Sequence, residues 1–252
     1  MHKILKLILT ASLLISLQLP AEIYEIKSIK EVLNHLDSRE AQIVVFDIDN
    51  TLLCPKQDLG SDQWFSYVAK QNMINGLNQI EAYDQILPTY FHIQKYINLL
   101  PTESDLAGSV KEIEQVCDHT ICLTARSLQL LDITIEQLAK NNLDFHVPEI
   151  NRAKLDLPQN SIYQDGVLFC GHNCKGQVLK QFLAACHYTP TQIILVDDKR
   201  YNLESVEKQL SLVGIKFIGL RYAGCDERIA GFNINQANQD LVDFLSRYPL
   251  NN

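Results

Sequence analysis

One apolar run that ends in two carboxylates constrains the fold more than any other stretch of this chain. It spans residues 43–53 and has the sequence IVVFDIDNTLL. A short, continuous β-branched run predicts a strand that is buried on both faces of a sheet. Asp47 follows at the carboxyl end of this strand, where open α/β sheets carry their chemistry, and Asp49 lies two positions further on. Because two carboxylates this close repel each other, we expect a divalent cation beside them.

The rest of the chain alternates between apolar runs and helical patterns. Further strands are expected at about residues 120–124, 167–170, 192–197 and 215–220. Helices are expected at about residues 28–38, 127–140, 175–186, 203–210 and 236–247. Ser28 and Glu31 match a capping box, and Asp165-Gly166 predicts a hairpin turn. The alternation predicts an α/β fold with a doubly wound, mostly parallel sheet covered by helices on both sides.

Residues 54–119 interrupt this alternation and predict a helical insertion. Four helices are expected here: one from Ser61, one at 77–87 that ends before Pro88, one from Ile93 to Leu100, and one that begins near Ser104. An insertion of about sixty residues is too long for a loop. It leaves directly from the strand end that carries Asp47, so we interpret residues 54–119 as a cap. The core is then formed by residues 22–53 and 120–252, and the alternative is that the insertion only enlarges the core.

The first 21 residues have the pattern of a secretory signal peptide. Lys3 and Lys6 precede an apolar stretch from Leu7 to Leu17, and Pro20-Ala21 follows. We therefore expect a protein exported to the periplasm or secreted, with residues 1–21 removed. The alternative is an uncleaved N-terminal membrane anchor, although the apolar span is short for a membrane crossing. The remaining sequence contains no segment as long as a transmembrane helix.

Charge and cysteine content narrow the classes of partner and site. The net charge is −8 and no basic run exceeds two residues, which argues against a nucleic-acid-binding surface. Seven cysteines in an exported chain leave at least one thiol without an intramolecular partner. Several lie inside apolar runs, where cysteine packs as a small hydrophobic residue, and the sequence assigns no disulfide.

Three of the expected strands end in polar groups that suit phosphate chemistry. These groups are Asp47 with Asp49, Thr124, and Asp197 with Asp198, while Lys175 lies at the start of a helix. In a doubly wound sheet these strand ends converge on one crevice. The sequence therefore predicts that all six side chains share a site.

The chemistry of these residue types suggests a division of roles. Asp47 would attack phosphorus and form an aspartyl-phosphate, and Asp49 would protonate the leaving oxygen and later activate water. Mg²⁺ would be held by Asp47 and Asp197 with a backbone carbonyl and waters, with Asp49 and Asp198 as further candidate ligands. Lys175 and Thr124 would hold the phosphoryl oxygens. The expected substrate is a small phosphorylated molecule.

These motifs resemble those of the haloacid dehalogenase (HAD) superfamily of phosphohydrolases. Residues 47–51 match the first motif of the family, D-x-D-x-T, and Thr124 looks like the second. Lys175-Gly176 looks like the third motif, and Asp197-Asp198, with Asn202 shortly after, looks like the fourth. The resemblance implies a Rossmann-like core, Mg²⁺ dependence and a nucleophilic Asp47, and the insertion is similar to the C1-type caps of the family. Both an acid-phosphatase-like branch and bacterial branches without assigned function fit this pattern.

Other kinds of site fit the sequence less well. An EF-hand loop that starts at Asp47 would need Gly where Leu52 stands and Glu where Asp58 stands. A zinc site at Cys170, His172 and Cys174 lacks a fourth ligand. A phospho-accepting receiver domain would place its acidic pair first and its lysine last, the reverse of the order here. The remaining alternative is an exported binding or effector protein that keeps this fold with little or no turnover.

Four assignments near the site stay open. Asp198 either helps to hold the metal or orients Asp197, and Asn202 is either an ordinary helix residue or a partner of the site. Arg126 contacts the substrate or forms a surface ion pair. Thr51 is expected to orient the turn after Asp49 rather than to take part in the chemistry.

Overall fold

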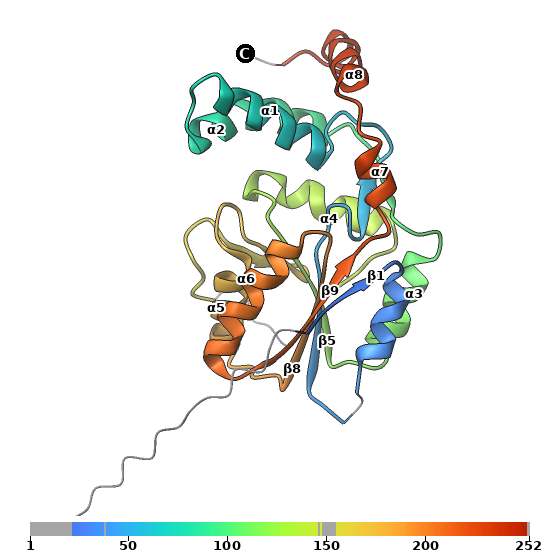
Figure 1. Ribbon diagram of the computed structural model, residues 1–252, viewed down its shortest axis with the longest axis vertical. Helices are drawn as coiled ribbons and strands as arrows, with labels where there is room; N and C mark the ends of the chain where they lie inside the picture. Colours follow the sequence, from blue (N-terminus) through green and yellow to red (C-terminus); the bar gives the residue numbers. More distant parts are fainter. Residues whose placement is uncertain (1–21, 38, 146, 148–154, 251–252) are drawn as a thin grey trace, which may run out of the picture.

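A seven-stranded sheet forms the centre of the computed structural model, which describes residues 22–37, 39–145, 147 and 155–250 (Figure 1). The expected signal peptide, residues 1–21, lies outside the described residues. The strand order is β1-β9-β8-β2-β5-β7-β6. The strands are β1 (Glu22–Ile26), β2 (Gln42–Phe46), β5 (His119–Thr124), β6 (Ile162–Gln164), β7 (Val167–Phe169), β8 (Gln192–Asp197) and β9 (Lys216–Tyr222). All neighbours are parallel except β6 and β7, so the predicted mostly parallel α/β sheet is confirmed.

Strand β2 lies in the middle of this sheet, and all five of its residues are buried. It pairs in parallel with β8 on one side and β5 on the other. Phe46, its last residue, is level with Val196 of β8 and Cys122 of β5. The carboxyl ends of the three strands therefore reach the same edge of the sheet, and Asp47 follows β2 directly at that edge.

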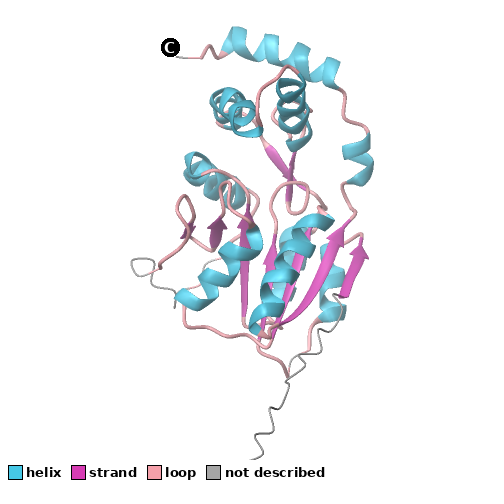
Figure 2. Cartoon of the chain, turned by 60° about the vertical axis from the view of Figure 1, so that its left-hand side comes forward, coloured by secondary structure: helices cyan, strands magenta, loops and turns pink. Residues whose placement is uncertain are grey.

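Helices cover both faces of the sheet, as Figures 1 and 2 show. Helices α5 (Lys175–Ala185) and α6 (Arg200–Leu210) pack against each other and against one face. The 3-10 helix η1 (Ile29–His35) and helix α3 (Leu106–Glu114) cover the other face. Successive residues of β2 alternate between the two cores, with Val44 in one and Val45 in the other. This alternation is the two-residue period of a strand, and it holds β2 in a single register.

Two local predictions are confirmed in detail. The Ser28 side chain and the Glu31 side chain form the reciprocal capping box at the start of η1. Asp165 and Gly166 have positive φ values of 48° and 77° and connect the antiparallel strands β6 and β7. Two positive φ values are what a two-residue hairpin turn with the twist of the strands requires.

The insertion forms a pair of long helices on a two-stranded stem. The stem consists of β3 (Leu53–Pro55) and β4 (Leu99–Pro101), which are antiparallel, and the helices are α1 (Asp62–Ile74) and α2 (Gln79–Gln94). Both helices lie beyond the carboxyl ends of the parallel strands (Figure 1). We use "cap helices" for α1 and α2.

The expected helix end before Pro88 is wrong, because α2 continues through this proline to Gln94. A proline inside a helix removes the hydrogen bond to the carbonyl of Asp84. Both residues lie on the exposed side of α2, where water can satisfy that carbonyl, and buried residues such as Ile86 and Ile93 hold the other side. The separate helix expected from Ile93 to Leu100 is also absent from the described structure, since residues 99–101 form β4.

The fourth expected helix of the insertion is α3, and it packs on the sheet side of the molecule. It contacts η1, and the Glu103 carboxylate just before it accepts hydrogen bonds from the Ser28 hydroxyl at 2.9 Å and the Ile29 N–H at 2.7 Å. Lys30 and Glu112 add an exposed ion pair. These contacts fix α3 against η1.

The C-terminal segment runs from the sheet up to the cap helices. After β9 come α7 (Asp226–Ala230) and α8 (Ile234–Arg247), and α8 lies across the far side of α1 (Figures 1 and 2). Aromatic contacts join the two parts, with ring centroids 6.4 Å apart for Tyr67 and Phe232 and 5.7 Å apart for Tyr96 and Phe244. Helix η2 (Leu128–Leu130) and α4 (Leu131–Lys140) lie between the sheet edge and the cap helices. None of the helices described is long and apolar enough to cross a membrane.

Candidate functional site

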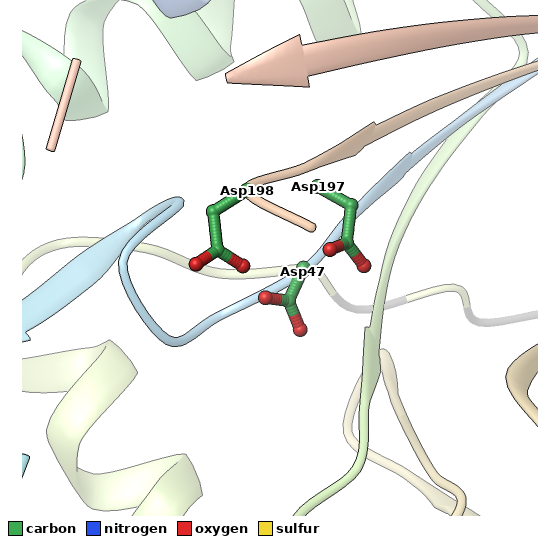
Figure 3. Close-up of side chains that lie close together, drawn as sticks. All are labelled: Asp47, Asp197 and Asp198. Carbon is green, nitrogen blue, oxygen red and sulfur yellow. The ribbon is translucent and has the colours of Figure 1, made fainter. Parts of the chain in front are cut away.

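Three buried carboxylates gather at the carboxyl ends of β2 and β8 (Figure 3). They belong to Asp47, Asp197 and Asp198, and an oxygen atom of each lies within 4.8 Å of the others. The parallel register of β2 and β8 brings them together, because Asp47 follows Phe46 and Asp197 follows Val196. The sequence prediction placed these residues in one site, and the structure brings them into one cluster.

Lys175 joins two of these carboxylates. Its Nζ atom lies 2.6 Å from Asp47 Oδ1 and 2.7 Å from Asp197 Oδ2. Lys175 is the first residue of α5, and side chains in a helix lean toward its N-terminus, which here faces the strand ends. The lysine is 5% exposed, and although burial disfavours its charge, the two aspartates raise its pKa above the usual value.

Gly176 allows α5 to begin this close to the sheet edge. A Cβ atom at this position would lie 2.5 Å from the carbonyl oxygen of Ser205 in α6. Any larger residue would push α5 away from α6 and would move Lys175 with it. The Lys-Gly pair is thus explained by the approach of two helices.

The surroundings of Asp47 oppose the ionisation of its carboxyl group. Burial raises the pKa of its carboxyl group to about 7, and Asp197 and Asp49 add to this rise against the opposing effect of Lys175. Its Oδ2 atom lies 3.5 Å from the Thr51 hydroxyl. The Thr51 hydroxyl accepts a hydrogen bond from the Asp198 N–H at 3.0 Å, so it links the two strand ends, as expected of a residue that orients this turn.

Asp198 carries the least satisfied polar atom of the cluster. Its Oδ2 accepts a long hydrogen bond of 3.4 Å from the Asn50 side chain, and its buried Oδ1 has no hydrogen-bond partner among the described residues. Burial, together with Asp47, raises the pKa of Asp198 to about 8. A buried carboxylate oxygen without a partner is costly, and a hard cation is a suitable partner for it. The donor set, three carboxylates at one sheet edge, therefore fits a divalent cation such as Mg²⁺.

Asp197 is fixed by groups that follow it in the chain. Its Oδ1 accepts a hydrogen bond from the Lys199 N–H at 2.8 Å, and the Asn202 amide donates to both of its oxygens at 2.9 and 3.0 Å. Asn202 is thus a partner of the site and holds the carboxylate toward Lys175.

Asp49 lies apart from the three gathered carboxylates and pairs with Arg126. The guanidinium donates to both carboxylate oxygens, from Nη2 at 2.8 Å and from Nε at 2.9 Å. Its Nη1 donates to the Thr134 hydroxyl and the Gln137 side chain of α4 at 3.0 and 2.7 Å. Burial opposes ionisation of Asp49, but Arg126 outweighs it and lowers the pKa of Asp49. The sequence left open whether Arg126 contacts the substrate or forms a surface ion pair. In the structure it is a buried partner of Asp49.

A turn that begins directly after Asp47 carries Asp49, so the two aspartates have different surroundings. Asn50 has a φ of 60°, a left-handed conformation that asparagine tolerates better than most residues. The N–H groups of Leu52 and Leu53 both donate to the Ile48 carbonyl, at 3.0 and 2.9 Å, and close the turn. Asp47 precedes this turn and lies with Asp197 and Asp198, whereas Asp49 lies within the turn and pairs with Arg126.

Thr124 lies at the end of β5, fully buried. Its hydroxyl accepts a hydrogen bond from the Arg126 N–H at 3.1 Å. The predicted phosphate-binding threonine therefore shapes the turn that carries Arg126 toward Asp49.

The cap helices reach the site with aromatic and charged side chains. Tyr90 of α2 packs near the Asp49–Arg126 pair, and burial, with Asp49 adding, raises the pKa of its hydroxyl. It stacks on Trp64 of α1 with ring centroids 6.5 Å apart. Lys199, next to the acidic pair, forms an ion pair of 2.8 Å with Asp62 at the start of α1. The cap helices are thus joined directly to the strand ends.

Comparison with known proteins places the chain in a family. Residues 25–247 match the family described as "Protein of unknown function (DUF2608)". The chain belongs to the DUF2608 family. This match includes the sheet edge, the cap helices and most of the C-terminal segment.

Two chlamydial proteins are similar to this chain in sequence. A "Putative outer membrane protein" of Chlamydia trachomatis serovar D is 28% identical over 201 residues, which is 79% of this DUF2608 chain and 76% of the relative. A protein of the same description from Chlamydia pneumoniae is 28% identical over 199 residues, with 79% and 76% covered. Among solved structures, a haloacid dehalogenase-like family hydrolase from Streptococcus pneumoniae has 15% identity and a TM-score of 0.41, covering 76% of this chain and 98% of that chain.

Proposed function

We propose that this chain is a Mg²⁺-dependent phosphomonoester hydrolase that works through an aspartyl-phosphate on Asp47. The observation that carries the proposal is the buried carboxylate cluster. Asp47 and Asp197 share Lys175, while Asp198 keeps a buried oxygen without a partner in the described structure. A cluster of this composition is costly unless cation and phosphate chemistry use it.

The balance of charge supports a divalent cation. The four carboxylates of the two acidic pairs face two buried cations, Lys175 and Arg126, and Lys199 is already paired with Asp62. When all four carboxylates are ionised, two negative charges are left over, which matches the charge of Mg²⁺.

Three carboxylates would hold this Mg²⁺, those of Asp47, Asp197 and Asp198. Asp49, the fourth predicted ligand, has its carboxylate engaged by Arg126, so we assign it proton transfer instead. Bound Mg²⁺ would neutralise the cluster and the charge of the phosphoryl oxygens.

Asp47 would act as the nucleophile. One of its oxygens attacks phosphorus, so that an O–P bond to Asp47 forms while the ester P–O bond breaks. The leaving oxygen takes a proton from Asp49. Water then attacks the same phosphorus, gives a proton back to Asp49, and releases phosphate and free Asp47. Lys175, 2.6 Å from Asp47, offers a positive charge to the phosphoryl oxygens in both steps.

Arg126 would act as a positioning residue for Asp49. Its Nη1 contacts to α4 fix the guanidinium, and its other two donors fix both oxygens of Asp49. In the resting site this pairing keeps Asp49 ionised, which is the form of a base. An anionic phosphate ester close to the pair would compete for Arg126 and raise the pKa of Asp49, which favours the acid form needed first.

The test uses the full chain, a generic aryl phosphate and Mg²⁺. We expect hydrolysis that EDTA stops and that added Mg²⁺ restores. Asp47→Asn should abolish turnover, while Asp84→Asn, at an exposed position of α2, should leave it unchanged. Turnover that survives Asp47→Asn would overturn the nucleophile assignment. Absence of turnover on a broad panel of phosphate esters would instead favour the binding or effector alternative.

We also propose that the protein is exported. The segment before residue 22 has a signal-peptide pattern, and the two chlamydial relatives carry the description "Putative outer membrane protein". Cell fractionation with N-terminal sequencing should find a mature protein outside the cytoplasm that lacks the first 21 residues. A full-length protein in the membrane fraction would favour the N-terminal anchor instead.

A further inference from the structure

A pair of cysteines lies where the C-terminal segment meets the stem of the cap helices. Cys54 is the middle residue of β3, and Cys225 directly precedes α7. Both belong to the same buried cluster, Cys54 as a half-buried member and Cys225 at 4% exposure. Each thiol lies close enough to shift the pKa of the other, although they are 171 positions apart.

A neighbouring arginine holds these two segments side by side. Arg228 of α7 donates through Nη2 to the Pro55 carbonyl and, at 3.1 Å, to the Gln57 carbonyl. The Asn233 N–H donates to the Asp58 carboxylate at 3.0 Å. In Figure 1, α7 runs alongside the stem strand β3. Cys225 therefore lies near Cys54 because hydrogen bonds hold the segment around α7 against β3 and the residues that follow it.

We propose that Cys54 and Cys225 form a disulfide under oxidising conditions and so cross-link the cap stem to the C-terminal segment. This inference is independent of the proposed hydrolysis. With glutathione disulfide as oxidant, the Cys54 thiolate attacks one sulfur and releases one glutathione thiolate. Cys225 then loses its proton and displaces the second glutathione, so two protein thiols become one disulfide and two glutathione thiols form.

The surroundings of the two thiols suit Cys54 to attack the oxidant and Cys225 to resolve the mixed disulfide. The interaction with the Cys225 thiol lowers the pKa of Cys54 to about 7 against the effect of burial, and Arg228 adds to the lowering. The same interaction, with burial, raises the pKa of Cys225. Cys54 is thus the more accessible thiol and the better attacking group, and Cys225 is the resolving thiol.

The other five cysteines lie in the described part of the chain and have different surroundings. Cys174 contacts the Ser205 hydroxyl, 2.9 Å away, and Cys117 donates to the His119 carbonyl at 3.5 Å. Cys122 and Cys170 are fully buried and belong to the cores on opposite faces of the sheet. Cys117 and Cys186 are half-buried like Cys54, and Cys117 serves as the matched control.

A cross-link here would act on the cap. Strand β3 connects the catalytic turn to α1, and its partner β4 leads to Thr102, whose hydroxyl donates to the Thr51 carbonyl at 2.7 Å. A disulfide would fix this stem to the end of β9, and it would close a long loop, which favours stabilisation. Disulfides belong to oxidising compartments, which agrees with the proposed export.

The experiment equilibrates the reduced full chain with glutathione mixtures of increasing oxidising strength, blocks the free thiols, and maps the peptides by mass spectrometry. We expect one cross-link, between the peptides with Cys54 and Cys225, and a Tm several degrees higher in the oxidised protein. Both effects should persist in Cys117→Ser and vanish in Cys54→Ser and Cys225→Ser. The inference is overturned if the wild-type chain keeps both thiols free in the most oxidising mixture. A stable glutathione adduct on Cys54, or a cross-link between another pair, would overturn it as well.

Discussion

Replacement of Arg126 by glutamine tests the least expected part of the site. The change removes both hydrogen bonds to Asp49 and leaves the buried Thr134 hydroxyl and Gln137 side chain without their charged donor. Loss of one partner from a fully buried ion pair costs about 3–5 kcal/mol of folding free energy. The Asp49 side chain is 26% exposed, so water can recover part of this loss. We therefore expect Arg126→Gln to lower the free energy of unfolding by about 2–3 kcal/mol.

The assay is urea unfolding of the metal-free protein, supported by thermal unfolding. For a chain of this size, a loss of that magnitude corresponds to a fall in Tm of roughly 5–10 °C. Arg200→Gln is the matched control, since the Arg200–Glu204 pair is exposed, with side-chain exposures of 65% and 57%. It should change stability by about 0.5 kcal/mol or less. If Arg126→Gln is as mild as Arg200→Gln, the buried pair does not contribute as described.

Three further predictions concern the carboxylate cluster and the cap helices. Because the pKa values of Asp47 and Asp198 are raised in the folded protein, unfolding the metal-free chain releases protons. The stability of the metal-free protein should therefore fall as pH rises from about 4 to about 8. The gain in Tm on adding Mg²⁺ should grow over the same range. A gain in Tm that shrinks with rising pH would contradict this. Lys175→Gln should lower the stability of the metal-free protein by about 3–5 kcal/mol, and Mg²⁺ should restore part of it, as measured by urea unfolding; no recovery with Mg²⁺ would count against the cation site. Asp62→Asn removes the ion pair between cap and core and should increase acrylamide quenching of Trp64, the single tryptophan, which is 2% exposed; unchanged quenching would show that the ion pair does not hold α1.

The sequence was sufficient for the parts of the fold that local patterns determine. The apolar run before Asp47 forms the central strand, and the Asp165-Gly166 pair forms the predicted hairpin. The clustering of Asp47, Lys175 and Asp197 also follows, because parallel strands and the helices after them bring their polar ends to one edge of a sheet.

Contacts between distant elements were harder to predict. Arg126 is 77 positions from Asp49, and the acceptors that fix it belong to α4, so its role depends on how α4 packs. The available signal was weak: Thr134 and Gln137 lie three positions apart, so these two polar residues share one helix face with buried Leu138. Pro88 misled the prediction because its effect depends on which side of α2 faces water.

Trapping of the phosphorylated enzyme tests the central claim most directly. The full chain is mixed with an aryl phosphate and Mg²⁺, quenched in acid within one turnover, and digested for mass spectrometry. A phosphoryl group on the peptide that contains Asp47, absent from Asp47→Asn and from the EDTA-treated protein, is the predicted result. Turnover without any phosphorylated peptide, or a phosphoryl group on another residue, would contradict the assignment of Asp47 as the nucleophile.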